Sequence, residues 1–253
     1  MRKIITKIFA GICIVLCIIP EILNAQEKRP RNMPLYDDDN HHWGLFFGYN
    51  QMWFSPQYIN DYQNQKYNKG EGNICFEELN DDTTKEYWIN NISQSLPYGI
   101  SVGVPNNFRI AKYFDIRIIP TISYGECSFT YTGDTPIKSF KQTFDIQSVT
   151  GELPIFLKYK SKRYNNFVSY IIVGVNNKIN FTARKNDIKF KMYDFAPEIG
   201  TGFDFYVGYF KFGIEIKMSY GIRNMIDVEN KNVLTNSFDK LKSKTFQLSF
   251  TFE

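Results

Sequence analysis

The sequence predicts an all-β protein, an eight-stranded antiparallel transmembrane β-barrel with short periplasmic turns and long extracellular loops. Residues 210–222 alternate apolar and polar side chains without a break. Such a run exceeds the roughly 5–6 residues of an average soluble strand and suits a tilted membrane strand of about 9–11 residues. After Gln26 no apolar run approaches the roughly 20 residues that a membrane helix needs, so any insertion must use a closed barrel.

The composition excludes several other classes of protein. The chain holds 23 Phe and 17 Tyr among 253 residues, which is too aromatic for a disordered protein. Its net charge is +4, and residues 1–25 contain three of its basic residues and one acidic residue, so the remainder carries +2. That remainder has no polybasic face to attract a polyanion, and we expect no nucleic-acid partner.

Residues 1–25 read as a secretory signal peptide. Basic residues at positions 2, 3 and 7 precede a 12-residue apolar run, which ends before Pro20 and the small residue Ala25. The run is too short to span a bilayer as a helix. We expect Sec-dependent export, cleavage near Ala25, a periplasmic lead-in at residues 26–42 and an outer-membrane barrel at residues 43–253.

Alternation of period two places the strands of the barrel. The predicted strands lie at residues 43–49, 98–104, 115–124, 152–159, 171–176, 198–207, 210–222 and 245–253. Long polar connections are expected at residues 55–96, 131–141, 181–195 and 224–241, and short ones at residues 105–112, 161–167 and 208–209. Bacterial barrels place long loops outside the cell and short turns in the periplasm, which puts both termini in the periplasm. A soluble sandwich or lipocalin-like cup also alternates, but it would place its charges on the outer face.

Charged side chains occupy the face of these strands opposite the apolar one. They are Arg117, Glu152, Lys158, Glu198, Asp204, Lys211, Glu215 and Lys217. An eight-stranded barrel has an interior that side chains fill, so we interpret these charges as a packed network in the lumen rather than a solute path. In that network, Arg117, Lys211 and Lys217 would neutralise Glu152, Glu198 and Glu215, with the pairing left open because it depends on strand register.

No motif indicates an enzyme, a cofactor, a bound metal or a small-molecule substrate. The two histidines, His41 and His42, stand at the periplasmic start of the first strand, so a catalytic site on the extracellular side would contain no histidine. The run DDDNHH around them reads as a solvated approach to the strand, since no distant ligands complete a tetrahedral site. Cys75 and Cys127 are the two cysteines after residue 25 and form a candidate disulfide in an oxidising compartment.

Several blocks of the sequence resemble the PorT family, outer-membrane barrels of the Bacteroidetes type IX secretion and gliding apparatus. The blocks lie at residues 151–167 (GELPIFLKYKSKRYNNF), 170–178, 197–224 and 239–253, with a further likeness at residues 32–50. Together they cover about half of the chain after residue 25. The long segment at residues 55–96 does not contribute.

The resemblance implies an integral outer-membrane protein, without enzymatic activity, that is required for type IX protein secretion and in some bacteria for gliding motility. A narrow plugged barrel cannot pass folded cargo, so it implies a role in assembly or docking beside the translocon. Its expected partners are outer-membrane lipid and type IX secretion components. The docking segments would be residues 32–42 and the turn carrying Lys160, Lys162 and Arg163, although that basic turn is equally suited to anchoring at lipid headgroups. The alternatives are a small porin-like channel and a surface-binding barrel.

Overall fold

The computed structural model describes residues 31–59, 66–68, 86–95, 98–183, 190–226 and 237–253. The predicted signal peptide and Cys75 therefore lie outside the described residues. The elements are the 3-10 helix η1 (Tyr36–Asp38) and the strands β1 (His41–Trp43), β2 (Leu45–Tyr58), β3 (Lys66–Asn68), β4 (Glu86–Gln94), β5 (Gly99–Gly103), β6 (Asn106–Ala111), β7 (Phe114–Ile118), β8 (Thr121–Asp134), β9 (Ser139–Lys160), β10 (Phe167–Asn180), β11 (Tyr193–Val207), β12 (Phe210–Tyr220) and β13 (Phe238–Phe252). Among these residues no helix has the length and apolar character needed to cross a membrane.

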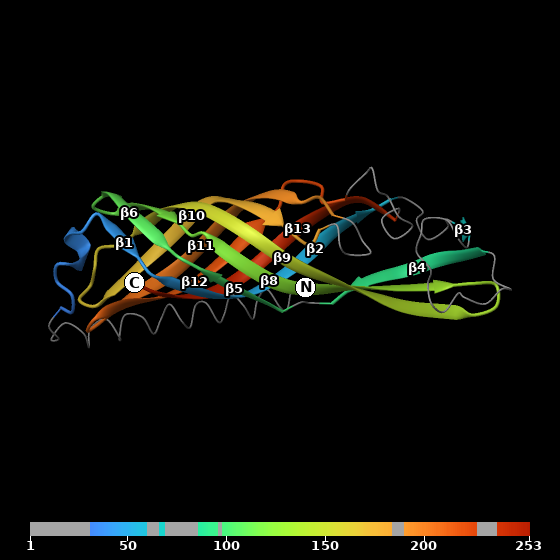
Figure 1. The fold of residues 1–253 in the computed structure, drawn as a ribbon, viewed down its shortest axis with the longest axis horizontal. Coiled ribbons are helices and arrows are strands. Elements are labelled where there is room, and N and C mark those ends of the chain that lie inside the picture. The colour runs from blue at the N-terminus through green and yellow to red at the C-terminus, as the bar shows by residue number, and fades with distance from the viewer. Residues whose placement is uncertain (1–30, 60–65, 69–85, 96–97, 184–189, 227–236) are drawn as a thin grey trace, which may run out of the picture.

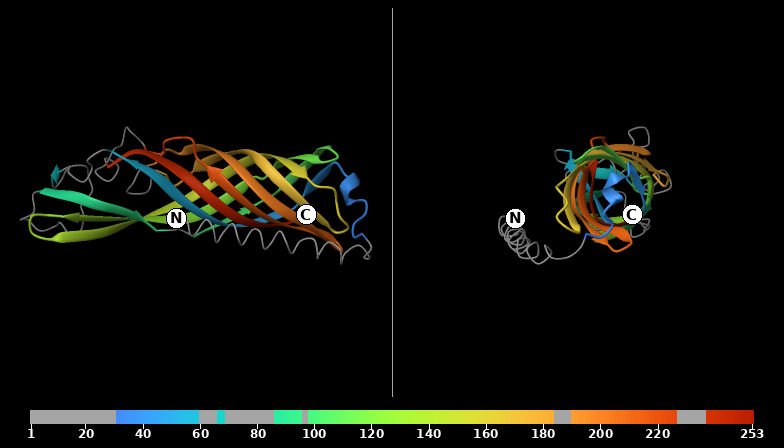
Figure 2. Two further views of the ribbon diagram at one scale, coloured as in Figure 1. Left: turned by 180° about the vertical axis from the view of Figure 1, so that it is seen from behind. Right: turned by 90° about the vertical axis from the view of Figure 1, so that its left-hand side faces the viewer.

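Antiparallel pairings close the sheet on itself, which confirms the predicted all-β antiparallel barrel. The ring runs β9, β10, β11, β12, β13, β2, β5 and β8 and returns to β9, because β8 pairs with β9 as well as with β5. β13 pairs with β2 from Phe252↔Leu45 to Phe238↔Tyr58, which joins the last strand to the first. Figure 2 shows the ring end-on, with the lead-in and η1 at one end of it.

Three of the short strands continue their neighbours around the ring. β1, β6 and β7 pair with one another and with β9 at one end of the barrel, where they extend β2, β5 and β8. Pro105 and Pro120 stand at two of the interruptions, since proline has no N–H to give to a ladder. Gly44 stands at the third, where an added Cβ would lie 2.0 Å from the carbonyl oxygen of Phe252.

The faces of the strands follow the predicted alternation. On β12, the side chains of Phe210, Ile216 and Met218 face outward and are exposed, whereas Lys211 and Glu215 face the lumen and are buried. An outward apolar band with tyrosines near its rims is typical of a transmembrane barrel. The short turns at residues 112–113, 161–166 and 208–209 share one end of the barrel with the lead-in, which we call the lead-in end, and the turn between β8 and β9 lies beyond the opposite, hairpin end (Figure 1).

Two predicted connections are wrong. Residues 131–141 were expected to form a long loop, but β8 and β9 extend through them as a hairpin with a turn at residues 135–138. Residues 105–112 were expected to form a turn, but most of them belong to β6. The predicted loop at residues 55–96 also contains β3 and β4, and β4 pairs with the β8 hairpin. Polar composition suggested loops here, although alternate side chains such as Phe129, Tyr131 and Phe140 are buried.

Apolar residues fill the interior toward the hairpin end and continue onto the hairpin, which projects beyond the ring (Figure 1). This cluster includes Phe54, Phe129, Tyr131, Phe190 and Phe238. The rings of Phe54 and Phe190 stack with their centroids 5.2 Å apart. The lumen is therefore charged toward the lead-in end and apolar toward the hairpin end, whereas the sequence indicated only its polar part.

Candidate functional site: a charged lumen closed by the lead-in

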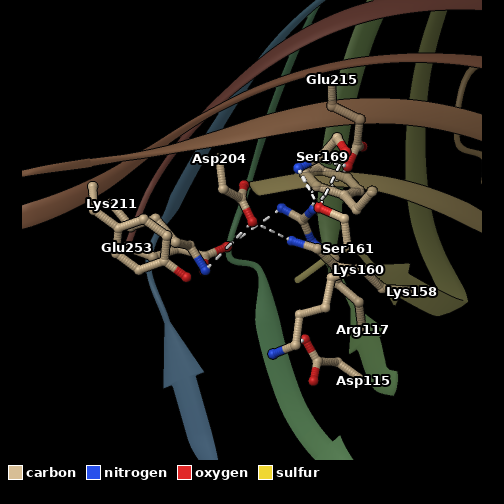
Figure 3. Close-up of polar contacts among 12 residues, drawn as sticks. Asp115, Arg117, Lys158, Lys160, Ser161, Ser169, Asp204, Lys211, Glu215 and Glu253 are labelled. Carbon is tan, nitrogen blue, oxygen red and sulfur yellow. Dashed lines mark hydrogen bonds and ion pairs between the residues drawn. The ribbon is translucent and has the colours of Figure 1, made fainter. Parts of the chain in front are cut away.

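Six charged residues form one cluster in the half of the lumen nearer the lead-in end (Figure 3). Arg117 on β7 donates from Nη1 to Glu215 Oε2 on β12 at 2.7 Å, and its Nη2 lies 3.4 Å from Glu253 Oε1. Lys158 on β9 donates to Asp204 Oδ2 on β11 at 2.7 Å. Lys211 forms an ion pair with Glu253 and lies 3.9 Å from Asp204. Three cations thus face three carboxylates, so the cluster is electrically balanced.

Tyr170 on β10 ties this cluster together. Its hydroxyl donates to Glu215 Oε2 at 3.0 Å, and Lys158 Nζ lies 3.6 Å from the centroid of its ring. The guanidinium of Arg117 and the carboxylate of Glu215 are both fully buried. A buried charge is tolerated only when it is paired and hydrogen-bonded. The cluster is therefore a rigid filling of the lumen.

A second cluster lies further along the lumen. Glu198 on β11 accepts a hydrogen bond from Asn176 Nδ2 at 2.8 Å, and Glu152 on β9 accepts one from the same amide nitrogen at 2.6 Å. Lys178 and Lys217 lie 3.9 and 3.8 Å from Glu198, so two cations again balance two carboxylates. The ammonium of Lys217 also sits 5.0 Å from the ring centroid of Phe156 and 5.2 Å from that of Phe46.

The eight charges predicted for the lumen thus all lie in it, in two groups. The structure settles pairings that the sequence left open, since Arg117 contacts Glu215 and Lys217 lies 3.8 Å from Glu198. Lys211 differs, because it contacts Glu253 and Asp204 rather than a glutamate at the positions considered. Glu152 contacts the amide of Asn176.

Sequence reasoning missed several members of these clusters. They are Tyr170, Asn176, Lys178 and Glu253. The alternation of β10 could have identified the first three. They stand at even-numbered positions, whereas the outward residues Ile171 and Val173 stand at odd-numbered ones. Glu253 follows directly after β13, and because Phe252 faces outward, alternation directs the Glu253 side chain into the lumen. Its contact with Arg117, however, depends on the pairing of β13 with β2 and β12.

Arg163 holds the lead-in against the rim at the lead-in end of the barrel. The guanidinium of Arg163 lies 3.1 Å from Asp37 Oδ2, donates to the backbone carbonyls of Asn32 and Met33, and stacks 3.6 Å from the ring centroid of Tyr206. The Tyr206 hydroxyl donates to Asp37 Oδ1 at 2.9 Å. Burial acts to raise the pKa of Asp37, but the hydrogen bonds from Arg163 and Tyr206 outweigh it and hold that pKa below its ordinary value.

Aromatic contacts complete this closure. The ring of Tyr36 in η1 stacks on that of His42, with centroids 3.9 Å apart, and Lys211 Nζ lies 4.9 Å from the Tyr36 ring. His41 stacks on Phe108 at 4.6 Å. In the part of the chain that the structure describes, no three His, Cys, Asp or Glu side chains converge as metal ligands. The histidines of the DDDNHH run are therefore placed in ring contacts at the rim.

The three residues expected to dock partners occupy different environments. Lys160 lies 3.0 Å from Asp115, and Arg163 is bound to the lead-in, so both are engaged within the chain. Lys162 is exposed at the tip of the turn. On the neighbouring turn, Tyr209 is 99% exposed, which makes it a surface residue that the sequence did not single out.

Cys127, the described member of the candidate disulfide, is a buried free thiol on β8. Gln94 Nε2 donates to its Sγ at 2.9 Å. Because Cys75 lies outside the described residues, the pairing stays a prediction.

Small cavities interrupt the filling of the lumen. One of about 10 Å³ lies at the lead-in end among Tyr36, Asp115 and Lys211, and one of about 30 Å³ lies among Phe54, Lys178 and Met225. A single water needs roughly 10–15 Å³, so each holds only one or two waters. The described lumen is a packed interior.

A family model matches most of the chain. Residues 24–227 match the model of a family described as outer membrane protein beta-barrel domain. Among solved structures, the outer membrane protein OprG from Pseudomonas aeruginosa matches at 10% identity with a TM-score of 0.37, covering 83% of this chain and 95% of that one. No curated protein matches. Because the family model spans most of the sequence, the chain belongs to the outer membrane protein beta-barrel domain family.

Proposed function

We propose that this protein is a non-conducting outer-membrane barrel that serves type IX protein secretion as an assembly or docking component, working through its periplasmic end. The observation that carries the non-conducting part is the lumen itself. Its charges are buried in two balanced clusters, and the lead-in is fastened across the periplasmic rim. The assignment to type IX secretion rests on the resemblance of residues 151–167 and 197–224 to the PorT family.

The periplasmic end offers a surface suited to docking. Arg163 and Lys160 hold the rim and lead-in in place, which leaves Lys162 and Tyr209 to meet a partner. A rigid rim lowers the entropic cost of association, because its loops need no ordering on binding. Type IX secretion components are the proposed partners, and no catalytic step is assigned to the protein.

The test is deletion of the gene in its native host followed by complementation. We expect proteins with the type IX C-terminal signal to accumulate in the periplasm of the deletion strain and to return to the medium with the wild-type gene. Complementation by Lys162→Glu should restore secretion poorly, whereas Lys138→Glu, at the exposed turn of the extracellular hairpin, should restore it fully. Unchanged secretion in the deletion strain would refute the secretion role.

Conductance measurements distinguish the proposed function from the alternative of a porin-like channel. The proposed function predicts no single-channel current in planar bilayers from the purified barrel. A steady ion current, altered in selectivity by Glu215→Gln, would favour the channel instead. His41→Ala with His42→Ala is the matching test against an enzyme, since secretion should survive both changes.

The projecting hairpin favours surface binding as a second candidate. β8 and β9 rise beyond the ring with β4 paired to β8, and their outward side chains are polar. Shortening the hairpin by removing residues 131–141 should abolish surface binding but leave secretion intact. Loss of secretion in that variant would mean that the hairpin belongs to the secretion role.

A further inference from the structure

The outer face of β13 changes from apolar to basic toward its extracellular end. From the periplasmic side, its outward side chains are Phe252, Phe250, Leu248 and Phe246, followed by Lys244, Lys242 and Lys240. Alternate residues on a strand are about 7 Å apart, so the three lysines form a ladder directly above an apolar stripe. This arrangement goes beyond the proposed secretion role, because it faces the lipid rather than the periplasm.

The neighbouring strands contribute aromatic and uncharged residues to the same face. Lys244 is opposite Tyr220 on β12 and Trp53 on β2, and its Nζ lies 5.2 Å from the centroid of the Tyr220 ring. Lys242 and Lys240 are opposite Ser55 and Gln57. Tyrosine and tryptophan on the outer face of a barrel mark the membrane interface. The ladder therefore stands at and above the headgroups of the outer leaflet.

The ladder has no ion pair among the residues that the structure describes. Within the described part of the chain, none of Lys240, Lys242 and Lys244 has a carboxylate at salt-bridge distance. Lys240 and Lys242 are exposed, and Lys244 is half-buried. The lysines of the lumen, by contrast, lie within reach of carboxylates. A row of free ammonium groups at a headgroup interface attracts an anionic group from the membrane.

A cavity opens beside the ladder where the barrel wall is unpaired. β2 continues to Tyr58, but its pairing with β5 ends at Asn50↔Gly99. Beyond that point a side chain bridges the wall, since the backbone N–H of Phe54 donates to Gln94 Oε1 at 3.2 Å. The cavity measures about 300 Å³ and is lined by Gln51, Trp53, Gln94, Ser95 and Phe246. Two large aromatic side chains with amides and a hydroxyl suit an acyl chain near its polar end.

We propose that this face binds lipid A, the phosphorylated glycolipid anchor of the outer leaflet. Its phosphates would contact Lys240, Lys242 and Lys244, and one acyl chain would lie along Phe246 and Trp53 into the cavity. Two features of the surface match two features of this lipid, namely phosphate charge above and acyl chains below. A glycerophospholipid of the same charge has the same general chemistry, so it serves as the competing ligand in the test.

The experiment measures binding of diphosphoryl lipid A to the full-length protein in a neutral detergent. Each lysine near an anionic lipid contributes about a fivefold change in affinity, so Lys240→Gln with Lys242→Gln and Lys244→Gln should weaken binding about a hundredfold. The matched control carries Lys112→Gln, Lys138→Gln and Lys141→Gln, which removes the same charge from exposed positions away from β13 and should bind normally. Heat-modifiable mobility on a gel verifies that every variant is folded.

Trp53 provides a second readout at the cavity. In a Trp43→Phe, Trp88→Phe background, its emission should shift to the blue and saturate with lipid A. Ser95→Leu, which fills the cavity, should abolish the shift without removing the lysines. The proposal fails if the lysine variant binds like the wild type, if the control weakens equally, or if phosphatidylglycerol binds as tightly as lipid A.

Discussion

Substitution of Glu215 by Gln tests the packed-lumen reasoning most directly. The change is nearly isosteric and keeps an acceptor for Arg117, but it removes the carboxylate that lies 2.7 Å from the guanidinium. Arginine cannot lose its charge in a protein, so the cluster would hold one unbalanced buried positive charge, and Arg117 would keep the 3.4 Å contact to Glu253 as its remaining carboxylate contact. Breaking a fully buried pair costs about 3–5 kcal/mol, and the retained acceptor places this variant near about 3 kcal/mol.

The assay is urea unfolding of the barrel in lipid vesicles, followed by tryptophan fluorescence and gel mobility. A loss of about 3 kcal/mol in the free energy of unfolding lowers the ratio of folded to unfolded protein by about two powers of ten. Glu126→Gln, an exposed change on β8, is the matched control and should shift stability by less than about 0.5 kcal/mol.

The double variant Arg117→Gln with Glu215→Gln completes the cycle. Removing both charges together should recover most of the loss, because two neutral amides can hydrogen-bond in the same space. Tyr170 would lose a charged acceptor, so recovery to within about 1–2 kcal/mol of the wild type is expected. The reasoning is refuted if Glu215→Gln is as stable as the control, or if the double variant is less stable than either single one.

The remaining predictions concern the rim and the wall. Arg163→Ala removes the contacts that hold the lead-in and should speed proteolysis within residues 31–40 several-fold. The exposed control Lys162→Ala should leave that rate unchanged. Equal proteolysis rates in the two variants would contradict the role of Arg163 in holding the lead-in against the rim. The pKa of Asp37 is lowered in the folded protein, so docking of the lead-in should be at full strength above about pH 4 and should weaken only as the pH falls through the lowered value. The mobility of a spin label on the lead-in would report this change. Weakening already at pH 6 would contradict the role of Asp37 in holding the lead-in. Gly174→Ala should reduce the folded fraction on a gel, since a Cβ there would lie 2.1 Å from a backbone oxygen, whereas Gly125→Ala, with its nearest atom at 3.8 Å, should fold normally.

Local patterning determined much of this protein. Side chains of a strand alternate every two residues, so the sequence alone assigned Arg117, Glu198 and Glu215 to the interior and Ile199 and Ile216 to the lipid face. Polar composition, by contrast, wrongly predicted a loop at residues 131–141, where the burial of the side chains alternates as in the other strands. There Tyr131 and Phe140 are held in strands by an apolar cluster whose other members, such as Phe190 and Phe238, come from distant parts of the chain.

Only the tertiary structure decided which interior groups meet. Lys211 contacts Glu253 because β12 and β13 pair in the register that sets Phe212 opposite Phe252, which makes Lys211 and Glu253 direct cross-strand neighbours. Arg163 contacts Asp37 across 126 positions because the lead-in packs against the turn between β9 and β10. The lysine ladder of β13 acquires Trp53 and a cavity through the register of β2, which no local pattern specifies. The side of the sheet that a side chain occupies follows from its position in its own strand. The side chains that it contacts depend on the register of the strands in the closed ring.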